Sequence, residues 1–207
     1  GDAVCQAAHR ADCPFPQEMR YELPGLVIDN CAMAGRSSKT FREEGRLDDI
    51  AAHIRPGDLL VVSFGHNDAN RAKAERYVPA DAFGESLRPF WDAARSHGAV
   101  CIFASPVAMR EFDEAGVCHP SFAAYREAMR AFAAEVGAPF IDLGAATAAA
   151  NTAFGAERCK ARYMWVGAKQ DNAHQQNAGA CRTAQAFVQQ LLQDTTPALD
   201  VLRANFR

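Results

Sequence analysis

The sequence contains no apolar run of the roughly 18 to 20 residues that a transmembrane helix requires. It also has no long run of basic or acidic side chains, and its formal net charge is -3. Proteins that bind nucleic acid or an anionic membrane usually carry a basic patch, so we expect neither partner. The ligand is expected to be a small or neutral molecule.

No internal repeat or low-complexity linker divides the chain. Its 207 residues are 49% hydrophobic and 23% charged, which is enough apolar material for one substantial core. These values predict a single domain over residues 1–207, and we expect a monomer.

The chain has seven cysteines, but none has the C-x-x-C spacing of a metal site. This number is high for a cytosolic enzyme and favours a secreted or periplasmic protein with disulfides. Cys5 with Cys13 and Cys159 with Cys181 lie in loop-like sequence and are the expected pairs, whereas Cys101 is expected to be a free core thiol. The scattered histidines do not indicate a zinc site, and no cofactor is expected.

Four short apolar segments predict strands that are buried on both faces. They cover residues 26–28, 59–64, 100–104 and 140–143. Helical patterns are found at residues 48–54, 83–94, 122–136 and 175–192. Pro89 is expected to kink the second of these helices or to mark its start. The alternation predicts a three-layer α/β/α sandwich with a central parallel sheet.

Polar segments lie where such a sheet binds its ligands, beyond the carboxyl ends of the strands. Gly35-Arg36-Ser37-Ser38 and Gly65-His66-Asn67-Asp68 follow the first two predicted strands, and Asp171-Asn172-Ala173-His174 precedes the last helix. An acid three residues before a histidine can fix the imidazole tautomer and hold it as a general base. The alternative for this last segment is a helix N-cap beside a surface histidine. Together the segments indicate a hydrolase active site.

These segments resemble the SGNH, or GDSL-like, hydrolase superfamily, and within it the rhamnogalacturonan acetylesterase branch, over nearly the whole chain. In that family a Gly-Asp-Ser block supplies the nucleophile, a glycine and the asparagine of Gly-x-Asn-Asp supply oxyanion-hole donors, and Asp-x-x-His supplies the acid and the base. Gly35, Asn67, Asp171 and His174 match the last three functions in order. The resemblance implies a flavodoxin-like α/β/α fold and a serine esterase without a cofactor.

Alanine stands where this family has its nucleophile, because Gly1-Asp2-Ala3 occupies the place of Gly-Asp-Ser. Alanine has no oxygen to attack a carbonyl, so we expect the chain as given to be inactive or nearly so. Three explanations are open. They are an engineered serine-to-alanine change, a naturally inactive homologue, and a chance resemblance in which Ser37 or Ser38 is the nucleophile.

The resemblance implies roles for the other residues. A serine at position 3 would pass its proton to His174, and Asp171 would stabilise the resulting imidazolium. The backbone N–H groups of residue 3 and Gly35 and the Asn67 amide would hold the oxyanion.

Several further side chains are candidates for binding a sugar substrate. They are Arg36, Ser37, Ser38, His66 and Trp165, with Tyr163 as a further residue that could stack on a sugar ring. The serines could equally cap the following turn, and His66 could simply pack.

The resemblance therefore implies an exported carbohydrate esterase that removes acetyl or other acyl groups from an oligo- or polysaccharide, such as pectin or rhamnogalacturonan. Two alternatives are a non-catalytic glycan-binding pseudoenzyme, in which Ala3 is native, and an esterase of small or lipid esters.

Overall fold

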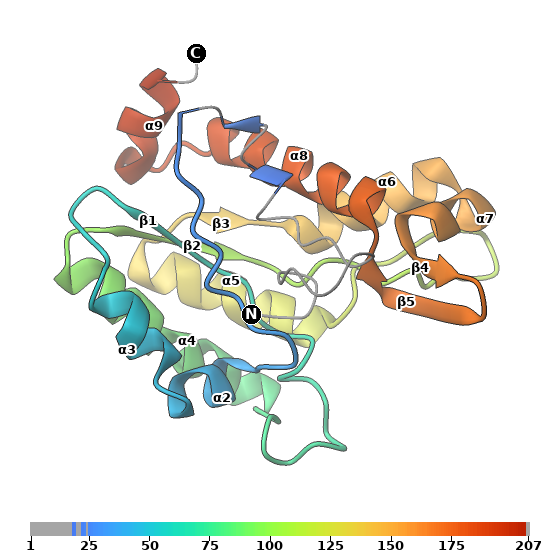
Figure 1. Cartoon of the computed structure of the whole chain (residues 1–207), viewed down its shortest axis with the longest axis horizontal. Coiled ribbons are helices and arrows are strands. Elements are labelled where there is room, and N and C mark those ends of the chain that lie inside the picture. The colour runs from blue at the N-terminus through green and yellow to red at the C-terminus, as the bar shows by residue number, and fades with distance from the viewer. Residues whose placement is uncertain (1–17, 20–21, 24, 206–207) are drawn as a thin grey trace.

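In the computed structural model of the protein, three parallel strands form the central sheet (Figure 1). They pair in the order β1 (Leu59–Val62), β2 (Val100–Ala104), β3 (Phe140–Ile141). Leu59 pairs with Val100, and Phe103 pairs with Phe140. The predicted parallel sheet is thereby confirmed for three of the four apolar segments.

The structure describes residues 18–19, 22–23 and 25–205. Gly1-Asp2-Ala3 and the expected Cys5–Cys13 pair lie outside the described residues.

Helices cover both faces of the sheet, which confirms the three-layer architecture (Figure 1). One face packs against α4 (Ala80–Ser96) and α5 (Ala123–Val136), and the other packs against α8 (Asn177–Gln193). Further helices between residues 25 and 205 are α2 (Ser38–Glu43), α3 (Arg46–Ala51), α6 (Leu143–Phe154), α7 (Ala156–Cys159), η2 (Lys160–Arg162), η3 (Pro197–Leu199) and α9 (Asp200–Asn205). None of the helices in the described ranges is long and apolar enough to cross a bilayer.

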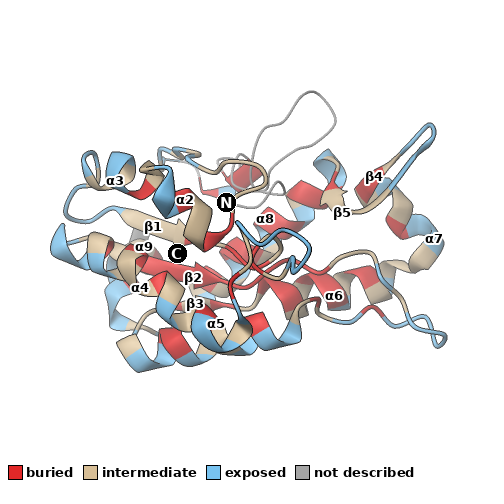
Figure 2. Cartoon of the chain, turned by 90° about the horizontal axis from the view of Figure 1, so that it is seen from below, coloured by how far each residue is buried: buried red, intermediate tan, exposed pale blue. Residues whose placement is uncertain are grey.

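The middle strand, β2, shows how the sequence produces two apolar faces. Successive side chains of a strand point to opposite sides. Cys101 and Phe103 accordingly join the core against α4 and α5, whereas Ile102 and Ala104 join the core against α8. Buried residues are concentrated in β2 and β3 and on the helix surfaces that face them (Figure 2). A continuous apolar run is therefore what this central strand requires.

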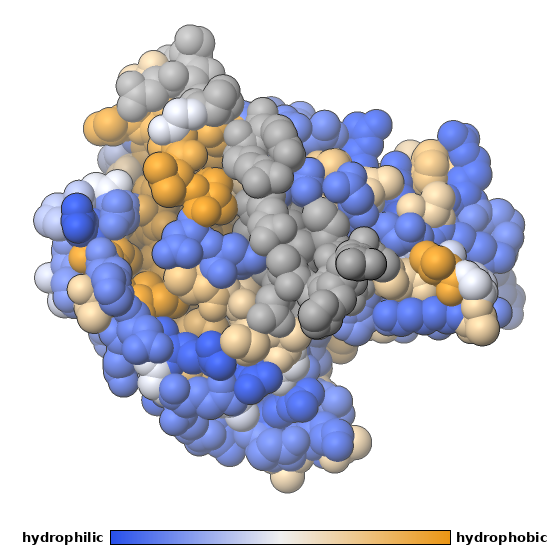
Figure 3. Space-filling view, in the orientation of Figure 1, coloured by the Kyte–Doolittle hydropathy of each residue, from blue (hydrophilic) through white to orange (hydrophobic). Residues whose placement is uncertain are grey.

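The first predicted strand, residues 26–28, is wrong, because this segment is extended but forms no ladder. Leu26 and Ile28 pack against the α8 side of the core, but Val27 between them is 96% exposed. Only one side of the segment is therefore covered. Figure 3 shows apolar side chains on this face of the molecule, over the region of β1. Pro89 does not mark the start of a helix either, since α4 runs through it from Ala80.

An antiparallel hairpin that the sequence analysis did not predict follows α7. It consists of β4 (Tyr163–Val166) and β5 (Lys169–Gln175). Val166 pairs with Lys169, so the turn has two residues, and its first residue, Gly167, has a φ of +59°. Glycine at the first position of a two-residue turn is a recognised hairpin signal. The apolar run before Gly167 could therefore have predicted the hairpin.

The expected disulfide between Cys159 and Cys181 is absent, because both are free thiols. The Cys159 thiol is buried and contacts Asn151 Oδ1 at 3.1 Å, whereas the Cys181 thiol contacts Glu18 Oε2 at 3.2 Å. Cys101 is a free buried thiol, as predicted.

A half-buried carboxylate just after β3 links α5 to the start of α6. Asp142 caps α6 by accepting from the Ala145 N–H at 3.1 Å, and it accepts from Arg126 Nε at 2.8 Å and Arg130 Nη2 at 2.6 Å. Burial alone would raise the pKa of Asp142. The hydrogen bond from Arg126, the Ala145 N–H and the charge of Arg126 instead lower the pKa of this carboxyl to about 2.

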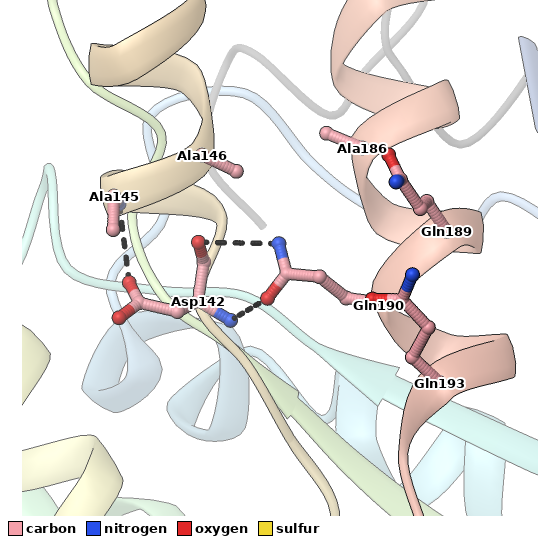
Figure 4. A pocket seen from close by; sticks show the side chains of 7 residues that line it. All are labelled: Asp142, Ala145, Ala146, Ala186, Gln189, Gln190 and Gln193. Atoms are coloured by element: carbon pink, nitrogen blue, oxygen red, sulfur yellow. Dashed lines mark hydrogen bonds between the residues drawn. The ribbon is translucent and has the colours of Figure 1, made fainter.

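A groove of about 270 Å³ lies beside Asp142, between α6 and α8 (Figure 4). It is lined by Asp142, Ala145, Ala146, Ala186, Gln189, Gln190 and Gln193. The Gln190 amide spans the groove and pairs with the backbone N–H and C=O of Asp142. Gln189 lies about 18 Å along α8 from its first residue, at a rise of about 1.5 Å per residue. The groove is therefore remote from residues 171–174, which precede that helix.

We expect Asp142→Asn to lower the free energy of unfolding by about 2 kcal/mol at pH 7, because the charge is lost while the α6 cap is kept. The pKa of the Asp142 carboxyl is lower in the folded than in the unfolded protein, so the ionised carboxyl stabilises the fold at a pH above its unfolded pKa. This contribution disappears as the pH falls from about 4 through about 2. Urea unfolding at several pH values measures it. A difference between the two proteins that stays constant from pH 6 to about pH 2.5 would contradict this role.

Candidate active site

Asp171 and His174 form a hydrogen-bonded pair on β5. Asp171 Oδ1 accepts from the backbone N–H groups of Ala173 and His174 at 2.8 and 2.9 Å, and Oδ2 lies 2.7 Å from His174 Nδ1. An Asx turn, not a helical turn, thus brings the two side chains together, at the irregularity in the β4–β5 register. The alternative of a helix N-cap is wrong, since Gln176 occupies that position in α8.

The electrostatics of the pair favour an ionised acid. Burial alone would raise the pKa of Asp171, but the two backbone N–H groups and the charge of His174 hold that pKa below its usual value. Lys169 Nζ, 3.4 Å from Oδ2, adds a positive charge. Because Nδ1 of His174 faces the acid, Nε2 is the nitrogen that can take a proton from elsewhere. The His174 side chain is 34% exposed, so solutes can reach it.

The segment after β2 fixes the hairpin in place. The Arg110 N–H donates to the Asn172 carbonyl at 2.7 Å, between Asp171 and His174. The Tyr163 hydroxyl donates to the Ala108 carbonyl at 2.6 Å. The acid–base pair is therefore tied to the carboxyl end of a central strand.

Of the two predicted aromatic residues, only one lies near solvent. Trp165 is partly exposed, its Nε1 donates to Asn172 Oδ1 at 2.9 Å, and its ring lies 4.8 Å from the cationic groups of Arg110 and Lys160. Tyr163 is completely buried, so the prediction that it stacks on a sugar is wrong. Trp165 is thus hydrogen-bonded to Asn172, the residue that follows Asp171 in the chain.

Gly35 and Asn67 meet at the guanidinium of Arg76. Gly35 has a φ of +74°, which favours glycine, and a Cβ there would lie 3.4 Å from Arg76 Nη1. The same Nη1 donates to Asn67 Oδ1 at 3.3 Å. The two predicted oxyanion-hole positions are therefore neighbours of one cation. The sequence analysis missed Arg76, because no motif marks a single arginine in a loop.

A buried carboxylate, Asp68, connects the loops that carry these two positions. It is completely buried, and Oδ1 accepts from the backbone N–H and the hydroxyl of Ser38 at 2.9 and 2.6 Å. Oδ2 accepts from the Gly65 N–H at 3.0 Å. Asp68 thus holds the start of α2 against the loop after β1.

The two serines after Gly35 are structural. Ser37 is completely buried and caps α2, since its hydroxyl accepts from the Thr40 N–H at 3.2 Å. Ser38 is also completely buried and donates to Asp68. Neither hydroxyl is accessible to an ester, so the predictions of a nucleophile or a sugar contact at these positions are wrong. The capping alternative is confirmed for Ser37.

The other two predicted contact residues are more exposed. Arg36 donates to the Ala34 carbonyl at 2.9 Å and pairs with Glu44 at 3.0 Å. The His66 ring packs edge-on against Phe122 with centroids 4.8 Å apart. Phe122 has a φ of +55°, a strained conformation for a bulky residue. His66 therefore packs against Phe122, which is the packing alternative given for this residue in the sequence analysis.

Close packing links the two halves of the site. A Cβ on Gly65 would lie 2.4 Å from Pro106 Cγ, so the loop after β1 lies directly against the segment after β2. That segment continues to Ala108 and Arg110, which bind the hairpin. Within the described ranges, no group of three or more His, Cys, Asp or Glu side chains could hold a metal ion.

Comparisons with known proteins agree with these features. Residues 1–180 match the GDSL-like lipase/acylhydrolase family. The chain is 35% identical to rhamnogalacturonan acetylesterase RhgT of Bacillus subtilis, over 86% of this chain and 79% of that protein. It is 39% identical to the probable rhamnogalacturonan acetylesterase YesY of the same species, over 75% and 71% of the two chains.

Solved structures share the fold. Protein YxiM of Bacillus subtilis superposes with a TM-score of 0.84 at 26% identity and covers 93% of this chain, which spans 55% of that protein. The acetylxylan esterase Axe2 of Geobacillus stearothermophilus superposes with a TM-score of 0.65 at 16% identity, over 90% and 83% of the two chains. The second likeness concerns the fold alone.

We expect Asp68→Asn to lower the free energy of unfolding by about 2 kcal/mol, because an amide NH₂ would face a backbone or hydroxyl donor in a buried site. Chemical denaturation measures this. Asp92→Asn, the same change at an exposed position of α4, is the matched control and should shift stability by less than about 0.5 kcal/mol. Equal effects of the two changes would show that Asp68 does not hold the loops together.

Proposed function

Because the chain belongs to the GDSL-like lipase/acylhydrolase family, we propose that it has the active site of a carbohydrate acetylesterase acting on a pectic polysaccharide of the rhamnogalacturonan type. The observation that carries this proposal is the Asp171–His174 pair, with its 2.7 Å contact and its partly exposed imidazole. The names of the two relatives at 35% and 39% identity support the substrate class.

In the proposed reaction, a serine hydroxyl at position 3 attacks the acetyl carbonyl while Nε2 of His174 takes its proton. Asp171 fixes the tautomer through Nδ1 and stabilises the imidazolium. The proton then passes to the departing sugar oxygen, and an acetyl-enzyme remains. Water then attacks this intermediate and loses a proton to His174, which passes it to the serine oxygen as the acyl bond breaks and acetate leaves.

The tetrahedral oxyanion is assigned to three donors, namely the N–H groups of residue 3 and Gly35 and the Asn67 amide. The neighbouring positions of Gly35 and Asn67 around Arg76 support this assignment. Each donor of this kind contributes roughly 3 kcal/mol to the stabilisation of a transition state.

We place the nucleophile at position 3, where this chain has alanine. The burial of Ser37 and Ser38 supports this choice over the alternatives in the sequence. On this proposal the chain as given binds its substrate but does not cleave it. The alternative of a glycan-binding pseudoenzyme predicts the same behaviour for this chain and differs from an engineered esterase only in that Ala3 is native.

We expect Ala3→Ser to create hydrolysis of 4-nitrophenyl acetate, with a gain of at least about 10³-fold over the chain as given, since a nucleophile is restored. His174→Ala in the same background should remove most of that gain. Initial rates of 4-nitrophenol release measure both. No gain would overturn the assignment of position 3, and a gain that survives His174→Ala would overturn the assigned base.

The substrate class is tested with the same active variant. Acetate release from acetylated rhamnogalacturonan should exceed release from acetylated xylan at equal acetyl content. Equal rates on both polymers would contradict the preference for pectin while leaving the esterase intact.

We expect Asp171→Asn in the Ala3→Ser background to lower kcat by roughly 10³- to 10⁴-fold, because an asparagine can hold the wrong imidazole tautomer. Asp113 forms a second, exposed pair with a histidine, with Oδ2 2.7 Å from His119 Nε2, and Asp113→Asn is the matched control. The control should keep full activity. Similar losses in both variants would show that the Asp171 effect is not specific.

A further inference from the structure

We propose that Arg76 is a positioning residue that orients the Asn67 amide in the oxyanion hole. This role rests on the proposed esterase function. Arg76 Nη1 donates to Asn67 Oδ1 at 3.3 Å and lies 3.4 Å from where a Cβ of Gly35 would be. One guanidinium thus binds one of the two oxyanion-hole positions among the described residues, Asn67, and lies beside the other, Gly35.

The chemistry of arginine explains how it would select one orientation. An amide presents an acceptor, Oδ1, at one side and a donor, Nδ2, at the other. A guanidinium has only donors, so the oxygen of Asn67 must face it and Nδ2 is turned away. In the flipped orientation Oδ1 would point toward the oxyanion and repel it. Arg76 therefore favours the amide orientation that donates.

The loop that carries Arg76 is fixed at both ends beside Asn67. The Ala69 N–H donates to the Gly65 carbonyl at 2.9 Å, and the Val78 N–H donates to the Asp68 carbonyl at 3.0 Å. The Tyr125 hydroxyl donates to the Val78 carbonyl at 2.7 Å and lies 3.3 Å from the Asp68 carbonyl.

Inside the loop, the Arg76 N–H donates to the Lys73 carbonyl at 2.9 Å. The base of the loop is thus anchored to residues 65 and 68, which flank Asn67 in the chain. This frame lets a long side chain hold one position relative to the amide.

The positive charge of Arg76 could also act directly on the oxyanion. Its ion pair with Glu75 is long, with 3.8 Å between Nε and Oε1. A direct charge effect would persist after the Asn67 amide is removed, whereas a positioning effect would disappear with it. A double-mutant cycle separates the two.

The test measures hydrolysis of 4-nitrophenyl acetate by the full chain with Ala3→Ser. Four further variants are made in this background: Arg76→Met, Arg76→Lys, Asn67→Ala and the double variant Arg76→Met/Asn67→Ala. We expect Arg76→Met to lower kcat roughly tenfold with KM changed by less than about twofold, since ground-state binding is untouched. Arg76→Lys should restore part of this loss, because lysine also only donates. In the Asn67→Ala background, Arg76→Met should change kcat by less than about twofold.

The matched control is Arg71→Met, which removes an exposed arginine of the same loop that lies over the Tyr77 ring, 5.9 Å from its centroid. It should leave kcat and KM unchanged. Three results would each overturn the role of Arg76. They are full activity of Arg76→Met, a loss of kcat from Arg76→Met that is as large in the Asn67→Ala background as without it, and a change in KM with kcat unaffected. If Ala3→Ser has no activity that depends on His174, the proposed function fails and this role fails with it.

Discussion

The buried carboxylate of Asp68 is the interaction on which the site depends. Its two oxygens bind donors from two segments that are far apart in the sequence, at Ser38 at the start of α2 and at Gly65 in the loop after β1. Removing either set of donors would leave a charged group in the core without hydrogen bonds, which is costly. The segment after Gly35 and the segment before Asn67 are therefore held together. Asp68 sets this geometry without being exposed to the site itself.

Much of the fold was predictable because the apolar runs at 59–62 and 100–104 can be buried only in the middle of a layered domain. The segment at 26–28 is also a short apolar run, but it is covered on one side only and pairs with no strand among the described residues. The difference is the exposure of Val27, which depends on what packs above it and not on local propensity. Short apolar runs specify burial more reliably than they specify hydrogen-bond pairing.

The candidate site was predictable where chemistry depends on neighbours in the sequence. Asp171 and His174 are three residues apart, and their contact is local. Arg76 could not be found in this way, because its relation to Gly35 arises only when two loops fold together. The sequence also suggested Ser37 and Ser38 as a nucleophile or as sugar contacts, because it does not show that both are buried. A serine after a glycine is typical of both a nucleophile and a helix cap, and only burial distinguishes the two.

The Asx turn on β5 has a consequence for how the enzyme could adapt. Three of the contacts of the Asp171 carboxylate lie within the next three residues of the same strand, so the acid and the base form one self-contained unit. A small shift of the hairpin would move the imidazole relative to the loops after β1 and β2 without altering its tautomer or its partner. Substitutions at hairpin anchors such as Tyr163 can therefore change where the imidazole lies, while the contact between Asp171 and His174 stays intact.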